Sequence, residues 1–334
     1  MVESSPTGQE RPLRFPLSRQ RRNVWMISGF VLIFSALGLI LSWTNPQIRS
    51  PLRPGLDFTG GTQIQLERDC GSSCPTIKAI DIQQKLGSLT LTPDDSSDKR
   101  AQSVPNLATA RVQLLDGGQS VVLRMPALTA SQGQAVIEAM EPVAGPFAVD
   151  GQSVDTIGPS LGGQLLRSSL ISLLVAFSGI ALYISIRYDG RYAVLALVAL
   201  GHDVLIVCGL FAWLGLVSGL EVDSLFAVSL LTIAGYSVND TVVVFDRIRE
   251  RQREDGDLPL DTQVDRAVSA TLTRTLYTSG TTLLPLLGLI VFGGSTLFWF
   301  AVALAAGVIV GSWSSIALAP SLLSIWPKQR TVGA

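Results

Sequence analysis

The chain has 334 residues, 47% of them apolar and 15% charged, with a mean hydropathy of +0.40; soluble domains carry about 25% charged residues, so a wholly water-soluble globule is excluded. A formal net charge of −1 excludes the basic field of a nucleic-acid-binding protein, and one histidine with three cysteines excludes a zinc site built on repeated Cys and His pairs. The class that remains is an integral membrane protein with a modest water-exposed part.

Six stretches are apolar and long enough to cross a bilayer, which requires about 20 helical residues. The first has no cleavage motif after it and is longer than the apolar region of a signal peptide, so we expect an uncleaved span. The spans are 24–43, 168–186, 192–220, 224–245 and two within 275–327 that hinge at 293–295. The predicted organisation is a tail over 1–23, the span 24–43, an extracytoplasmic domain over 44–163, five spans within 164–326 with a cytoplasmic loop near 247–270, and a tail over 327–334.

The positive charges of the connecting segments predict the orientation, because Lys and Arg stay on the cytoplasmic side of a membrane. Basic clusters alternate along the chain with connections, around 221–223 and 293–295, that hold no Lys or Arg. The clusters consist of Arg11, Arg14, Arg19, Arg21 and Arg22, then Arg187 and Arg191, then Arg247, Arg249, Arg251 and Arg253, then Lys328 and Arg330. All of them fall on one side when both termini are cytoplasmic.

The segment 44–163 is too long for a loop and is predicted to fold outside the cytoplasm. Its expected elements are a strand at 61–67, a helix at 76–89, strands at 111–115 and 120–125 around a hairpin turn at 116–118, a helix at 130–140 that ends before Pro142, and an extended segment at 147–157. The order β-α-β-β-α-β is that of a ferredoxin-like module. The segment 92–106, rich in Ser, Asp and Pro, is expected to be a mobile insert.

The cysteines admit two interpretations. Cys70 and Cys74 lie in the predicted outer domain, on the oxidising side of the membrane, where they either form a disulfide or remain two thiols in a surface turn. Cys208 lies inside a span and is expected to pack as a small apolar residue.

Charged residues at span depth are the most informative feature, because each costs roughly 2.5–3.5 kcal/mol to insert. Asp240 lies about 10 Å inside the cytoplasmic boundary marked by Arg247, and Arg274 lies about 12 Å inside the boundary marked by Arg266. A carboxyl group in apolar surroundings holds a proton more tightly than in water, and a nearby guanidinium weakens that hold. Joining and separating such a pair would load and release a proton, whereas a static ion pair that fixes the helix register is the simpler alternative.

Other polar residues of the spans form a second tier of candidates. His202 and Asp203 are either a proton relay or a satisfied polar pair at a helix contact. Ser237, Asn239 and Thr278 lie near the predicted pair and either line a water-filled path or serve ordinary helix packing. Pro285 is expected to interrupt and kink the fifth span.

Enzymatic activity is not expected. The chain has no Gly-x-x-x-x-Gly-Lys motif for ATP, and a Ser/His/Asp triad would require His202 inside the membrane. We expect no metal and no cofactor, and an ion gradient as the energy source.

Five motifs resemble the SecF side of the SecD/SecF family of bacterial Sec protein translocases, which belongs to the RND superfamily. They are Gly55-Leu-Asp-Phe-Thr-Gly-Gly61, Val154-Asp-Thr-Ile-Gly-Pro-Ser-Leu-Gly162, Ala199-Leu-Gly-His-Asp-Val204, the run from Ala234 to Glu250 around Gly-Tyr-Ser-Val-Asn-Asp-Thr, and Thr271-Leu-Thr-Arg-Thr-Leu-Tyr-Thr-Ser279. The resemblance extends from about Arg14 to Trp326.

The resemblance implies a six-span half of a twelve-span unit in the bacterial inner membrane, with SecD as the obligate partner. It implies association with the SecYEG channel and YajC, and use of a proton or sodium gradient to help export unfolded preproteins. It also implies ion conduction by Asp240 and Arg274, and a structural role for Asp57, Phe58, Thr59, Gly60 and Gly61. Two alternatives remain: half of an RND-type small-molecule antiporter, and a static scaffold for a partner membrane protein.

Overall fold

The computed structural model describes residues 16–70, 75–91 and 105–326. The chain divides into two compact units, one of Met1–Arg53 with Ile171–Ala334 and one of Pro54–Leu170. Both tails fall mainly outside the described residues, as do Cys74 and most of the expected insert 92–106.

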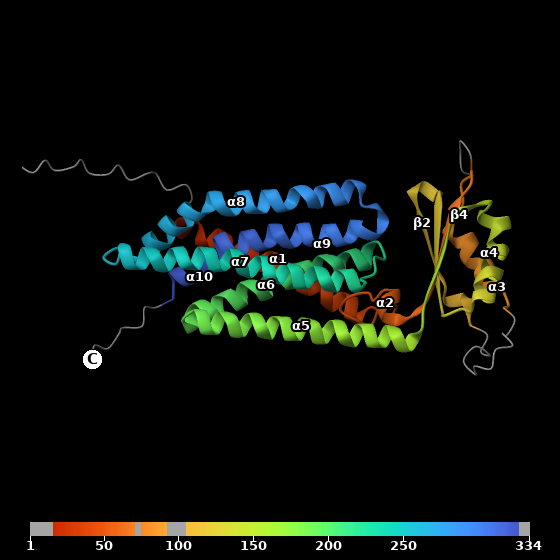
Figure 1. Ribbon diagram of the computed structural model, residues 1–334, viewed down its shortest axis with the longest axis horizontal. Helices are drawn as coiled ribbons and strands as arrows, with labels where there is room; N and C mark the ends of the chain where they lie inside the picture. The colour runs from red at the N-terminus through yellow and green to blue at the C-terminus, as the bar shows by residue number, and fades with distance from the viewer. Residues whose placement is uncertain (1–15, 71–74, 92–104, 327–334) are drawn as a thin grey trace, which may run out of the picture. The chain divides into compact units, whose positions relative to one another are not determined.

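The first unit is a bundle of long helices that run side by side (Figure 1). Its elements are α1 (Leu17–Thr44), the greater part of α5 (Pro159–Arg187), α6 (Gly190–Val217), α7 (Ser224–Glu254), α8 (Leu260–Phe292), α9 (Gly294–Trp313), the π-helix η3 (Ser314–Leu318) and α10 (Ala319–Ser324). Six helical segments in the described part are long and apolar enough to cross a membrane. The prediction of six spans is therefore confirmed.

Two prolines were expected to interrupt or end a helix, and neither does so. Pro285 lies inside the continuous helix α8 and does not interrupt it. Likewise, the helix of the second unit does not end before Pro142 but continues to Ala144. In both places the φ angle that proline fixes is compatible with a helix, and the chain loses one N–H donor. In a membrane, neighbouring groups satisfy the freed carbonyl.

Glycines and serines bring α1 against α6 and α7 against α9. A Cβ atom at Gly209 of α6 would lie 2.2 Å from the Cβ of Ser35 on α1, and one at Gly307 of α9 would lie 2.3 Å from Cγ1 of Ile233 on α7. Small residues allow this approach, which supplies the van der Waals packing that holds membrane helices together. In contrast, α5 and α8 leave most of their spanning side chains exposed.

The second unit is a four-stranded antiparallel sheet with two longer helices, α3 and α4, and the four-residue helix α2. Its elements are α2 (Leu56–Thr59), β1 (Gly61–Arg68), α3 (Ala79–Ser88), η1 (Leu107–Thr109), β2 (Arg111–Leu115), η2 (Asp116–Gly118), β3 (Ser120–Met125), α4 (Ala130–Ala144) and β4 (Phe147–Ile157). The strand order is β2-β3-β1-β4, so each β-α-β connection passes over the strand that lies between its ends. This is the predicted ferredoxin-like arrangement. Ile64, Leu66 and Leu123 form its core with Ile82 and Met140 of the helices.

The motif Asp57-Phe-Thr-Gly-Gly61 forms the turn that leads into β1. Asp57, Phe58 and Thr59 belong to the short helix α2, and Gly60 has a φ of +70°. Gly61 has a φ of +132°, and a Cβ atom there would lie 2.6 Å from the carbonyl oxygen of Met125 on β3. Only glycine fits such a backbone and such an approach. The two glycines therefore allow the chain to turn directly into the centre of the sheet.

Arg68 is a buried cation that the sequence did not single out. It is 6% exposed at the end of β1. Its guanidinium donates hydrogen bonds to the carbonyl oxygens of Ala144 at 2.7 Å, Gly118 at 2.8 Å and Pro75 at 3.0 Å. These bonds tie the end of α4 and the β2–β3 hairpin to the central strand. Nearby, Cys70 is disulfide-bonded, whereas Cys208 in α6 is a free thiol.

Candidate functional site

Asp240 lies in the middle of α7 and is 4% exposed. Its Oδ2 atom has no hydrogen-bond partner among the described residues. An ionised carboxylate with an unpaired oxygen is costly inside a membrane, where water cannot compensate. Asp240 is therefore the least satisfied carboxylate described in the spans.

Arg274 lies on the neighbouring helix α8, is exposed, and acts electrostatically on Asp240. Within the described ranges, however, neither of these two side chains forms an ion pair within 4.0 Å. The structure thus brings the predicted pair into electrostatic range without a direct contact.

The remaining predicted residues of this region have separate surroundings. Asn239 and Thr278 are exposed, and the Thr278 hydroxyl donates to its own helix, at the carbonyl oxygens of Thr275 (3.0 Å) and Arg274 (3.2 Å). Ser237 is buried and belongs to a different cluster. Of the three, Ser237 alone has a buried side chain.

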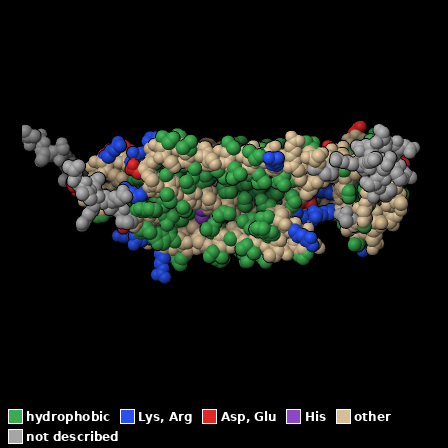
Figure 2. Space-filling view, turned by 90° about the horizontal axis from the view of Figure 1, so that it is seen from below, with side chains coloured by type: hydrophobic (Ala, Val, Ile, Leu, Met, Phe, Trp, Pro, Cys, Tyr) green, Lys and Arg blue, Asp and Glu red, His purple; other side chains and the backbone are tan. Residues whose placement is uncertain are grey.

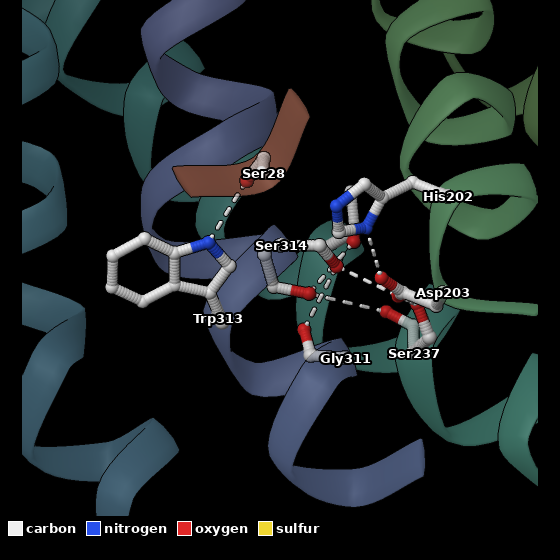
Figure 3. Close-up of polar contacts among 9 residues, drawn as sticks. Ser28, His202, Asp203, Ser237, Gly311, Trp313 and Ser314 are labelled. Carbon is white, nitrogen blue, oxygen red and sulfur yellow. Dashed lines mark hydrogen bonds and ion pairs between the residues drawn. The ribbon is translucent and has the colours of Figure 1, made fainter. Parts of the chain in front are cut away.

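That cluster is centred on Asp203 of α6, which is fully buried (Figure 3). The Nδ1 atom of His202 lies 2.9 Å from its Oδ1 atom. The hydroxyls of Ser237 on α7 and Ser314 on η3 donate to its Oδ2 atom at 2.6 Å and 2.7 Å. Three groups from three elements therefore surround one carboxylate, as a buried charge requires. Sequence reasoning ranked His202 and Asp203 below Asp240, yet theirs is the denser polar network.

The π-helix η3 supplies the residues that sequence reasoning missed. Ser314 and Ser315 are its first two residues, and both are fully buried. Ser314 reaches Asp203, whereas the hydroxyl of Ser315 pairs with that of Thr241 on α7 at 2.8 Å. Wide turns of this kind occur often at functional sites. The signal in the sequence is the hydroxyl-rich run 312–315 inside an otherwise apolar span.

Two tryptophans join α1 to the same region. Trp313 donates its indole N–H to the hydroxyl of Ser28 at 3.0 Å, and Trp25 donates to Ser321 at 2.9 Å. Among the described residues, no group of three or more His, Cys, Asp or Glu side chains lies close enough together to hold a metal ion.

Six spans and a ferredoxin-like domain between the first two of them define a multi-pass membrane protein. Two family models match it: the C-terminal region of the protein export membrane proteins SecD and SecF over residues 137–329, and the SecD/SecF GG motif over residues 49–71. The chain belongs to the SecD/SecF family. The second match covers Gly60 and Gly61, whose backbone conformation and close packing are described above.

Similarity to individual relatives supports this family assignment. The chain is 59% identical over 311 residues to the protein translocase subunit SecF of Prochlorococcus marinus, covering 93% of this chain and 95% of that one. It is 39% identical over 322 residues to SecF of Synechocystis, covering 96% of each chain. The crystal structure of SecDF from Thermus thermophilus matches with a TM-score of 0.76 and 29% identity, over 96% of this chain and 40% of that one. The chain is thus similar to one part of a longer SecDF chain.

Proposed function

We propose that this chain works as the SecF subunit of a complex with SecD in the bacterial inner membrane, with both termini in the cytoplasm. The complex uses the proton-motive force, or a sodium gradient, to assist late translocation of unfolded preproteins through the SecYEG channel, with YajC as an accessory subunit. Membership of the SecD/SecF family and the 59% identity to a SecF subunit support this proposal.

The observation that carries the ion-coupled part of the proposal is the state of Asp240. Its carboxyl group is buried at span depth with one oxygen unpaired, and Arg274 acts on it from α8 without touching it. A direct ion pair would favour a fixed charge, whereas this arrangement leaves room for a change in contact. Motion of α8 relative to α7 then changes how strongly Asp240 holds a proton. Arg274 cannot itself release a proton, so Asp240 is the carrier.

A SecD partner accounts for the exposed polar groups of the spans. Asn239 on α7 and Arg274 on α8 are both exposed, and α5 buries only 6% of its spanning residues. Polar side chains at this depth normally face protein or a water-filled cavity. A second six-span subunit packed against these helices would cover them, as expected for half of a pseudo-symmetric unit.

The decisive experiment compares Asp240→Asn with Asp246→Asn in inverted membrane vesicles that contain the whole complex. Asp246 is the matched control, because it lies on the same helix but is half-exposed and pairs with Arg187 at 3.5 Å. We expect Asp240→Asn to abolish the part of preprotein translocation that depends on the ion gradient and to spare the ATP-driven part. Asp246→Asn should retain both. Undiminished gradient-dependent export by Asp240→Asn would refute the proposal.

A charge-swapped variant separates this function from a static scaffold. In a scaffold, Asp240→Arg combined with Arg274→Asp would keep the opposite charges and restore export. In an ion carrier, the swap moves the titrating carboxyl group from the buried position to the exposed one, so export should remain defective.

A further inference from the structure

The imidazole of His202 has one nitrogen satisfied and one free. Its Nδ1 atom contacts Asp203, whereas its Nε2 atom has no hydrogen-bond partner among the described residues. The side chain is 94% buried, and a polar atom left unpaired at such a position is unusual. The Nε2 atom of His202 is therefore a candidate for binding a ligand.

A cavity of about 390 Å³ lies next to this residue, lined by α1, α6, η3 and α10. Its walls are mostly apolar, from residues such as Leu32 and Leu322, and His202 and Ser28 bring polar side chains to it. Figure 2 shows a small purple patch, the colour given to histidine, among apolar side chains.

Both polar side chains have unused hydrogen-bonding capacity. The hydroxyl oxygen of Ser28 accepts a hydrogen bond from Trp313, which leaves its own hydrogen to donate. Asp203 accepts hydrogen bonds from two serine hydroxyls. When its carboxylate is ionised it only accepts, so the Nδ1 atom of His202 then carries the hydrogen between them. In the neutral ring, Nε2 is then an acceptor with a free lone pair. This is the arrangement in which a carboxylate orients a histidine as a base.

We propose that His202, held by Asp203, is a second proton-binding site of this chain, reached by water through the cavity beside α1. Nε2 takes a proton from a hydronium ion, which leaves as water, and Nδ1 keeps its hydrogen bond to Asp203. The resulting imidazolium is balanced by the Asp203 carboxylate, so the pair becomes neutral overall.

Among the residues that the structure describes, no other titratable side chain lines the cavity. The side chains that α1, η3 and α10 contribute to its wall are uncharged, as are the Ser237 and Ser314 side chains that contact Asp203. The charged group nearest along α7 is Asp240, less than one turn from Ser237. The inference goes beyond the proposed function and does not depend on ion conduction by Asp240.

The test is solid-state NMR of the full-length chain in lipid bilayers, with the histidine ring labelled with ¹⁵N. Because the chain has a single histidine, the spectrum reports His202 alone. Between about pH 9 and about pH 5 we expect Nε2 to pass from the unprotonated to the protonated signal in one step, while Nδ1 stays protonated throughout. A ring that keeps one protonation state over this range, or that takes up its proton at Nδ1, would overturn the proposal.

Access through the cavity is tested with Gly29→Leu. Gly29 lines the cavity, and a Cβ atom there meets nothing within 4 Å, so a leucine fills the space without a backbone clash. Gly179→Leu on the exposed face of α5 is the matched control. We expect Gly29→Leu to slow hydrogen exchange at Nε2 and Gly179→Leu to leave it unchanged. Equal exchange in both variants would refute entry through the cavity, and the titration of the unsubstituted protein needs no variant to fold.

Discussion

Replacing Ser237 with Ala tests the hydrogen-bond network around Asp203. The substitution removes only a hydroxyl that donates to Oδ2 of Asp203 at 2.6 Å. Hydrogen bonds to charged groups contribute about 1.5–3 kcal/mol, because loss of the donor leaves a buried charge less satisfied. We therefore expect Ser237→Ala to lower the free energy of unfolding by about 2 kcal/mol.

Ser229 offers a control on the same helix. It is also fully buried, but its hydroxyl donates to the carbonyl oxygen of Phe226 within its own helix at 2.7 Å. Neutral side-chain hydrogen bonds in membrane proteins average about 0.6 kcal/mol, so Ser229→Ala should cost about that amount.

The measurement is reversible unfolding of the full chain in bicelles or mixed micelles, with helix content followed by circular dichroism. Ser314 donates to the same Oδ2 atom as Ser237, so their effects should not be additive. We expect the double alanine variant to lose more free energy of unfolding than the two single variants lose together, by about 0.5–1 kcal/mol. Equal losses for Ser237→Ala and Ser229→Ala would show that Asp203 does not depend on its donors.

Two further predictions concern glycines. Gly61→Ala should destabilise the sheet by about 1–3 kcal/mol, because its positive φ and the oxygen of Met125 both exclude a Cβ atom; lost hydrogen-exchange protection in β1 would show this, and unchanged protection would contradict it. Gly307→Ala should lower the thermal unfolding midpoint, because its methyl group would overlap Ile233. Gly280→Ala on α8 meets open space and should leave the midpoint unchanged, so equal midpoints for the two variants would count against close packing of α7 and α9.

The sequence was sufficient for the architecture because its signals are local. A membrane span needs a long apolar run, and the Asp-Gly-Gly turn at 116–118 with alternating apolar residues predicts a hairpin wherever it occurs. The same locality explains the choice of Asp240 and Arg274, since depth along a helix can be counted from the nearest basic cluster. Whether a residue faces another helix or the surface depends on how the helices pack, which the neighbouring residues in the sequence do not determine. Arg274 consequently proved exposed, whereas Asp240 is buried.

The network around Asp203 could not be predicted for the same reason. Its donors come from α7 and η3, far away along the chain, and their approach depends on how three helices pack. The π-helix adds a second difficulty. Helical periodicity assumes a constant turn, and the serines of η3 lie where that assumption fails.

The wide turn of η3 rotates the residues that follow it about the axis of the last span. An α-helix advances about 100° per residue, so one additional residue in a turn rotates everything beyond it by that angle. Ser321, which accepts the indole hydrogen of Trp25, lies just beyond this turn. A one-residue deletion within 314–318 would restore regular winding and rotate Ser321 away from α1. The span would keep its length and hydrophobicity and lose its registration with the first helix, so a hydropathy profile would not reveal the damage.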